Sequence, residues 1–89
     1  MSIRSELNLK DKIILTHMAS HGYWTPVAGV HRNLQEEGWA HWVVETTGYR
    51  MRHLTDLELL EKDTERRGFY RITRFGEEIA EEIDLPQHI

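Results

Sequence analysis

Arginine is the side chain with the clearest chemistry in this chain, and its distribution is uneven. Residues 46–55 and 64–74 together hold six arginines and a single acid, Glu65; the six are Arg50, Arg52, Arg66, Arg67, Arg71 and Arg74. Residues 76–89 hold five acids and neither lysine nor arginine. Guanidinium groups bind phosphate and carboxylate oxygens through paired hydrogen bonds. The basic middle can therefore attract a polyanion although the net charge is −4, because attraction depends on the local field.

Histidine is the second candidate chemical group. His17 and His21 are four residues apart, a spacing that lets two imidazoles on one helix share a metal ion. No glutamate follows His17 and no third ligand lies near it in the sequence, so we expect no metal site. The lack of cysteine excludes disulfides, thiolate metal sites and cysteine nucleophiles. No glycine-rich phosphate loop or Gly-x-Ser-x-Gly motif occurs. We therefore expect neither an enzyme nor a cofactor, and no small-molecule substrate is evident.

The length of 89 residues predicts one domain. We expect its core at about 11–83, with loose ends at 1–8 and 85–89. No apolar run approaches the roughly 20 residues that a membrane span needs, so no membrane partner is expected. The N-terminus lacks the apolar segment of a secretion signal, which predicts a cytoplasmic protein.

Periodic apolar residues predict the first helix at 11–20. Its buried face combines two pairs of residues four apart, Ile14 with Met18 and Leu15 with Ala19. Asp11 suits the positive N-terminal end of this helix, and Gly22 is expected to end it.

A second helix is predicted to begin at Thr25 and Pro26, as N-cap and first helical residue, and to end at Gly38. A very short strand at 23–24 precedes it. Its buried face is expected to hold Val27, Val30 and Leu34. Its outer side is expected to hold His31, Arg32, Gln35 and Glu36.

Residues 39–44 fit an extra helical turn, a buried connector or a short strand. Trp39 and Trp42 carry a large apolar area within this segment. We expect them to cover the small core. The alternative is a partner surface, because tryptophan is common at interface hot spots.

A third helix is predicted at about 47–58, capped by Thr46 or Thr47. At 100° per residue, its inward face holds Thr47, Met51, Leu54 and Leu57. Its outward face holds Gly48, Tyr49, Arg52, His53 and Thr55. These side chains offer donors for phosphates and base edges. Arg50 falls on the flank of the buried face, where it either extends to solvent or pairs with Glu45.

Two apolar runs around a basic turn at about 64–68 predict a β-hairpin. Leu60, Tyr70 and Ile72 are the expected inward residues, and Arg71 alternates outward. Thr73 can cap a last helix, whose buried stripe is formed by Ile79 and Ile83.

This order of three helices, a hairpin and a final helix resembles the winged helix-turn-helix transcriptional regulators. The similar residues run over 49–57, 59–62 and 68–77, and include the ending Tyr70-x-Ile72-Thr73-x-x-Gly76. The resemblance covers about 11–83, and the chain is similar in particular to small repressor-like proteins of haloarchaea and their viruses. It implies a mainly α fold with a small β-hairpin, of the α+β class.

The resemblance also implies a function, the regulation of transcription through double-stranded DNA. The helix at about 47–58 would enter the major groove, and the hairpin tip at about 64–68, the wing, would lie on the backbone. The residues expected to contact DNA are Thr47, Tyr49, Arg50, Arg52, His53, Thr55, Arg66, Arg67 and Arg71. A homodimer is expected, with the first helix, the last helix or the Trp39–Trp42 region as its interface.

Two features depart from the family pattern. The segment Leu57–Leu60 is shorter than usual and lacks the usual glycine after the recognition helix, so we expect that helix to end early. The link at 39–45 is longer than usual. The alternative function is a protein-interaction module that uses the same scaffold without binding DNA. The excess of acidic residues and the pair Trp39 and Trp42 favour this alternative.

Overall fold

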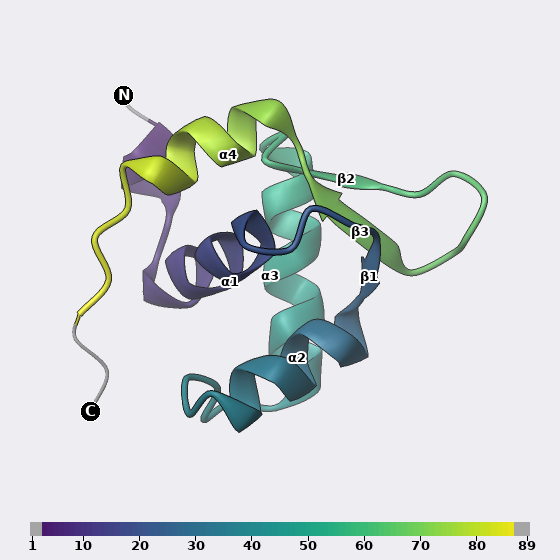
Figure 1. Cartoon of the computed structure of the whole chain (residues 1–89), viewed down its shortest axis with the longest axis horizontal. Helices are drawn as coiled ribbons and strands as arrows, with labels where there is room; N and C mark the ends of the chain where they lie inside the picture. Colours follow the sequence, from purple (N-terminus) through teal and green to yellow (C-terminus); the bar gives the residue numbers. More distant parts are fainter. Residues whose placement is uncertain (1–2, 87–89) are drawn as a thin grey trace.

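The computed structural model describes residues 3–86, apart from the side chain of Arg4. A short 3-10 helix at Ile3–Glu6 precedes four α-helices and three short strands (Figure 1). In chain order these are α1 Leu9–Ala19, β1 Thr25–Pro26, α2 Val27–Glu36, α3 Val44–Asp56, β2 Leu60–Lys62, β3 Phe69–Ile72 and α4 Arg74–Glu81. The expected α+β class is confirmed. The sheet is antiparallel with β3 in the centre, in the order β1-β3-β2.

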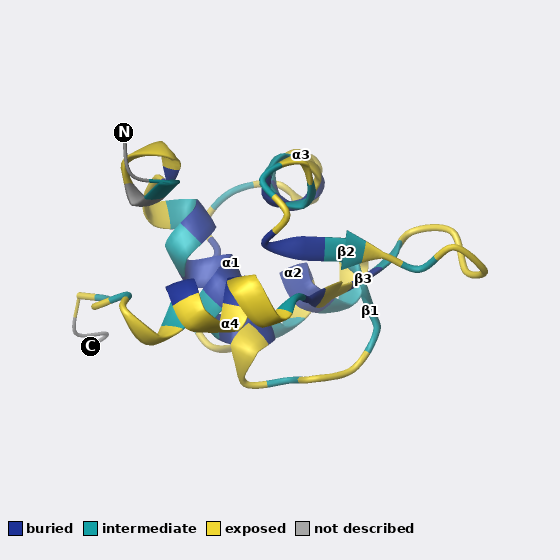
Figure 2. Ribbon diagram, turned by 90° about the horizontal axis from the view of Figure 1, so that it is seen from above, coloured by how far each residue is buried: buried dark blue, intermediate teal, exposed yellow. Residues whose placement is uncertain are grey.

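One core joins all four helices to the inner face of the sheet. Its buried apolar residues are Leu7, Ile13, Ile14, Leu15, Met18, Val30, Leu34, Ala40, Met51, Leu54, Leu59, Leu60, Tyr70, Ile72 and Ile79. Figure 2 shows the hairpin loop exposed and far from this core. Because Leu7 is buried and Leu85 packs against the core, the predicted range of 11–83 is too short. Residues 87–89 of the predicted loose C-terminal end lie outside the described part of the chain.

A capping box sets the start of α1. The Asn8 side chain accepts a hydrogen bond from the Asp11 amide at 2.9 Å, and the Asp11 carboxylate accepts one from the Asn8 amide at 3.1 Å. The helix therefore begins at Leu9, two residues before the predicted start. It ends at Ala19 with Ser20 as C-cap, so Gly22 does not terminate it. Ala19 is exposed, which corrects its assignment to the buried face.

The second helix starts later than expected, because Thr25 and Pro26 form β1. Thr25 pairs with Tyr70 of β3, and the Thr25 hydroxyl donates to the Tyr23 carbonyl rather than capping a helix. The predicted strand at 23–24 is thus shifted by two residues, and α2 begins at Val27. Val30 and Leu34 are buried as predicted, and Gly38, with φ of 83°, follows the helix as expected.

Residues 39–43 form a connector that is neither helix nor strand. Trp39 and Trp42 are half-buried and pack against the core, which is the covering role expected of them. The helix α3 begins at Val44, before either threonine that was expected to cap it. Thr47, Met51 and Leu54 are buried as predicted.

The chain reverses direction after α3 without a glycine. The helix ends at Asp56, and Glu58 adopts a φ of 65°, in the left-handed region that non-glycine residues rarely occupy. The Thr73 hydroxyl donates to the Glu58 carbonyl at 2.7 Å, and the Thr73 amide donates to the Leu59 carbonyl at 3.0 Å. These bonds anchor the strained turn to the start of α4.

The ending Tyr70-x-Ile72-Thr73-x-x-Gly76 has a physical reason at each position. Tyr70 and Ile72 point into the core, and the Thr73 side chain accepts a hydrogen bond from the Gly76 amide as the N-cap of α4. A methyl group at Gly76 would overlap the carbonyl oxygen of Leu59. Glycine therefore lets α4 pack directly on the turn after α3.

The last helix buries Ile79, as predicted, while Ile83 lies beyond the end of α4 and is half-buried. Among residues 3–86, no helix is both long enough and apolar enough to cross a bilayer.

Replacing Glu58 with glycine should stabilise the protein. Glycine adopts the left-handed conformation without steric cost, although it also raises the entropy of the unfolded chain. The expected gain is roughly 0.5–1 kcal/mol in the free energy of unfolding, measured by urea denaturation. Glu65→Gly, in the exposed hairpin loop, is the control and should give no gain. Equal effects of the two variants would contradict strain at Glu58.

Candidate nucleic-acid interface

The outer face of α3 carries three of the side chains predicted to contact DNA. Tyr49 is 60% exposed and Arg52 is exposed, while His53 is half-buried. Thr55 is also half-buried, and its hydroxyl donates to the Met51 carbonyl at 2.8 Å. Tyr49, Arg52 and His53 share one face of α3, opposite the buried residues Met51 and Leu54.

A groove runs between this face of α3 and the hairpin. Its volume is about 380 Å³, and it is lined by Tyr49, Arg52, His53, Thr55, Asp56 and Lys62. Lys62 lies at the end of β2, where it pairs with Tyr70 and belongs to the same side of the sheet as Leu60. Lys62 was not predicted from the sequence as a residue of the interface. Its position two residues after the inward-facing Leu60 could have shown that both lie on the same side of the sheet.

The two faces of the hairpin hold different cations. Leu60 and Lys62 of β2 share one face with Tyr70 and Ile72 of β3, whereas Glu61 lies opposite Arg71 on the other face. Arg71 Nε is 3.3 Å from the Glu61 carboxylate, and its guanidinium lies 4.4 Å from the centre of the Trp24 ring. Arg71 is therefore turned away from the groove beside α3.

The arginines of the hairpin loop also differ from each other. Arg66 stacks over Phe69 at 4.8 Å, on the side of the sheet that carries Arg71, and its Nε donates to the Asp63 carboxylate at 2.8 Å. The Glu65 amide and the Arg66 guanidinium lower the pKa of Asp63 by hydrogen bonding to it. Arg67 is exposed, and it lines a second hollow together with Lys62. The structure thus brings Arg67, rather than Arg66, to the side of Lys62.

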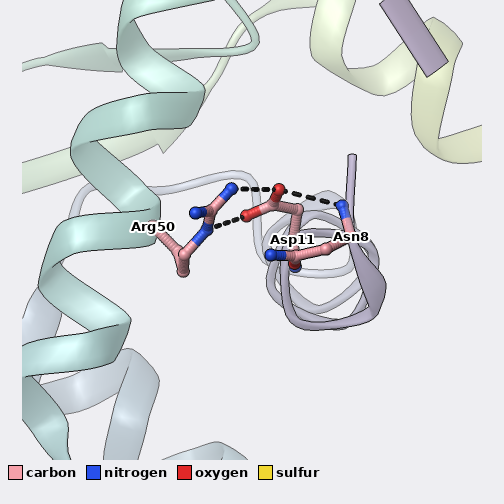
Figure 3. Close-up of polar contacts among 3 residues, drawn as sticks. All are labelled: Asn8, Asp11 and Arg50. Atoms are coloured by element: carbon pink, nitrogen blue, oxygen red, sulfur yellow. Dashed lines mark hydrogen bonds and ion pairs between the residues drawn. The ribbon is translucent and has the colours of Figure 1, made fainter. Parts of the chain in front are cut away.

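Arg50 does not belong to the candidate interface, because its guanidinium pairs with Asp11 of α1. Its Nε and Nη2 each donate to the Asp11 carboxylate at 2.6 Å (Figure 3). Asp11 is fully buried, and the Arg50 side chain is only 17% exposed. The hydrogen bonds to Asp11 raise the pKa of Arg50. Both sequence-based alternatives, solvent exposure and a pair with Glu45, are wrong because the partner lies on α1, 39 residues away.

Thr47 is likewise structural. Its hydroxyl oxygen accepts a hydrogen bond from Trp42 Nε1 at 2.8 Å and shares another with His31 Nδ1 at 2.7 Å. His31 is buried, which corrects its placement on the outer side of α2. Gly48 is also buried, because α3 approaches Val27 of α2 closely there. This network joins α2, the connector and α3, and it fixes the angle between the two helices.

The histidine pair lies at the C-terminal end of α1. His17 is buried, and its ring centre is 4.4 Å from that of His21, whose Nδ1–H donates to the His17 carbonyl. Burial and the neighbouring His21 lower the pKa of His17, while Glu37, at 3.7 Å, opposes them. Within the described residues, no three histidine or acid side chains are grouped to hold a metal ion.

Arg50→Met should be strongly destabilising, because it leaves the Asp11 carboxylate buried without its cation. The expected loss is about 3 kcal/mol in the free energy of unfolding. Adding Asp11→Asn removes the buried charge and should recover part of this loss in a urea-denaturation cycle. Arg52→Met, on the exposed face of the same helix, should change stability by less than about 0.5 kcal/mol. If Arg50→Met cost no more than Arg52→Met, the structural role of the ion pair would be wrong.

Stability should also fall with acidity because of His17. Its pKa is lowered from 6.5 in the folded protein, so the unfolded chain binds more protons as the pH drops through the usual range for histidine. The free energy of unfolding then decreases, by at most about 1.4 kcal/mol per pH unit. Urea denaturation near pH 7.5 and 5.5 should show a smaller decrease for His17→Asn than for the parent. The exposed His41→Asn control should keep the full decrease; the opposite ranking would refute this assignment.

Comparison with known proteins adds no family assignment: no family model, no curated protein and no solved structure matches this chain.

Proposed function

We propose that this protein is a DNA-binding transcriptional regulator of the winged helix-turn-helix kind. In this proposal α3 is the recognition helix in the major groove, and the β2–β3 hairpin is the wing. The observation that carries the proposal is the groove beside α3, where Tyr49, Arg52 and His53 meet Lys62 of β2. An aromatic ring, an imidazole and two cations on a convex helix and its neighbouring strand suit base edges and phosphates.

Two cations of this surface, Arg52 and Lys62, support DNA binding because no carboxylate among the described residues forms an ion pair with them. In the described part of the chain, Arg52 and Lys62 have no ion-pair partner, in contrast to Arg50, Arg66 and Arg71. Asp56 brings one negative charge into the groove. Binding therefore depends on the arrangement of a few cations rather than on a large positive surface.

The exposed ion pairs of the hairpin still leave a role for the wing. The Arg66 side chain is 54% exposed in its pair with Asp63, and both side chains of the Arg71–Glu61 pair are 44% exposed. Ion pairs open to solvent contribute little to stability, about 0–1 kcal/mol, so these arginines can exchange a carboxylate for a phosphate. Arg67 extends from the loop next to Lys62. Arg71 lies on the opposite face of the wing. It would contact DNA only if phosphates of the DNA lay along both faces of the wing.

Rigidity of the helix pair supports the same proposal. The bonds from Thr47 to His31 and Trp42 hold α3 against α2, and Arg50 holds it against α1. A recognition helix fixed in this way does not have to be ordered on binding. We further propose a homodimer on a two-fold site, because one module of this size covers a limited DNA surface.

The alternative function, a protein-docking module, is favoured by one observation. Two consecutive valines are exposed where α3 begins: Val43, the N-cap, is 64% exposed and Val44 is 38% exposed. Adjacent exposed apolar residues can mark a protein interface. A docking module would have no affinity for duplex DNA, which makes the two functions distinguishable.

Arg52→Ala should weaken binding to a duplex selected from a random pool by roughly 1–3 kcal/mol, if Arg52 reads a base. Lys62→Ala should weaken binding to selected and random duplexes alike and lower the salt slope by about one unit. Fluorescence anisotropy over a range of salt concentrations measures both effects.

The matched control is Arg74→Ala, which removes an exposed cation from α4 away from the groove. It should change binding much less than either groove variant. If the parent protein did not bind duplex DNA at moderate salt, the DNA-binding proposal would be overturned in favour of docking. If the parent bound DNA and all three variants bound it equally well, the groove beside α3 would not be the contact surface.

A further inference from the structure

Gly48 occupies a position inside α3 where glycine is unfavourable. The helix runs from Val44 to Asp56, and apart from proline no residue suits a helix interior less well than glycine. Gly48 is nevertheless buried, so the position is not simply a solvent-facing one that tolerates any residue. A residue that contradicts its local structure in this way often belongs to a functional site.

The packing of the backbone does not require glycine at this position. A methyl group on Gly48 would lie 3.3 Å from Arg52 Nη1 and 3.5 Å from Val27 Cγ1 of α2. The second distance is an ordinary van der Waals contact, and the tip of a long arginine side chain can move. At Gly76, by contrast, a methyl group would overlap the backbone carbonyl oxygen of Leu59. The missing side chain at Gly48 therefore makes room for one group in particular, the guanidinium of Arg52.

Arg52 lies back over Gly48, toward the N-terminal end of α3. Long side chains of a helix usually lean in this direction and cover the turn before their own Cα atom. Asp56 is four residues after Arg52, which is the usual spacing of an ion pair on a helix, and it lines the same groove. Among the described residues, no ion pair joins the two side chains. The space over Gly48 thus holds the guanidinium away from the carboxylate that would compete with a ligand.

We propose that Gly48 is a specificity-determining residue that positions Arg52 to recognise a base. This inference rests on the proposed function, in which Arg52 is presented to DNA from the outer face of α3. An arginine distinguishes guanine by two parallel hydrogen bonds to O6 and N7, and these require a fixed orientation of the planar guanidinium. A side chain at position 48 displaces the guanidinium and leaves Asp56 as its nearest partner on the helix. Gly48 therefore acts through Arg52 and contacts no base itself.

The test is a double-mutant cycle of Gly48→Ala and Arg52→Ala, followed by fluorescence anisotropy with the selected and the random duplexes. Gly48→Ala should weaken binding to the selected duplex about tenfold, because the bidentate geometry is lost. Binding to random duplexes should change little, because Arg52 keeps its charge. In the Arg52→Ala background, Gly48→Ala should have no further effect on binding. The urea midpoint of Gly48→Ala should be at least that of the parent, because alanine favours the helix.

Gly29→Ala is the matched control. It adds the same methyl group inside α2, where the nearest heavy atom is Thr25 Cγ2, also at 3.3 Å, so that no arginine is displaced. It should leave the ratio of the affinities for selected and random duplexes unchanged.

Four results would overturn the proposal while leaving DNA binding intact. They are an unchanged affinity ratio for Gly48→Ala, an equal loss of this ratio for Gly29→Ala, additive losses in the cycle, and a lower urea midpoint for Gly48→Ala. The last of these would show that packing, rather than recognition, requires the glycine. A parent protein that did not bind duplex DNA would overturn both this inference and the proposed function.

Discussion

The buried ion pair between Asp11 and Arg50 constrains the rest of this structure. Asp11 belongs to the capping box that starts α1, and its two oxygens also accept hydrogen bonds from the Arg50 guanidinium of α3. A carboxylate with no solvent exposure requires such partners, because an unpaired buried charge costs several kcal/mol. The orientation of α3 against α1 is therefore fixed by one carboxylate. The same pair removes from the candidate DNA-binding surface an arginine that the sequence analysis assigned to it.

The remaining cations are divided between two sides of the hairpin. Strand register places Lys62 beside α3 and Arg71 on the opposite face, where Glu61 and Trp24 contact it. The candidate interface thus depends on Arg52 and Lys62, with Arg67 at the loop. For an acidic chain this is consistent with binding that relies on the position of a few charges, since the total charge would repel DNA. Because the cations of this surface are few, the exposed apolar residues Val43 and Val44 keep protein docking as the alternative function.

The junction between α3, the hairpin and α4 shows how a departure from a sequence pattern is accommodated. Glu58 takes the left-handed conformation that glycine usually provides, and Thr73 holds the strained carbonyl while capping α4. Gly76 allows the close approach that brings these groups together. Hydrogen bonds from one threonine therefore offset backbone strain at a residue 15 positions earlier.

Features that follow from local periodicity and capping can be predicted from the amino-acid sequence alone. Met51 and Leu54 on one face of α3, the alternation of Tyr70, Arg71 and Ile72, and the cap at Thr73 were all predictable, because each depends on residues within one or two turns. The missing glycine also predicted the early end of α3. The folded structure was needed to find the partners of Arg50, His31 and Thr47, the position of Lys62 beside α3, and the approach of His17 to Glu37. Their partners lie on other elements, and a helical pattern records which face a side chain occupies but not what packs against that face.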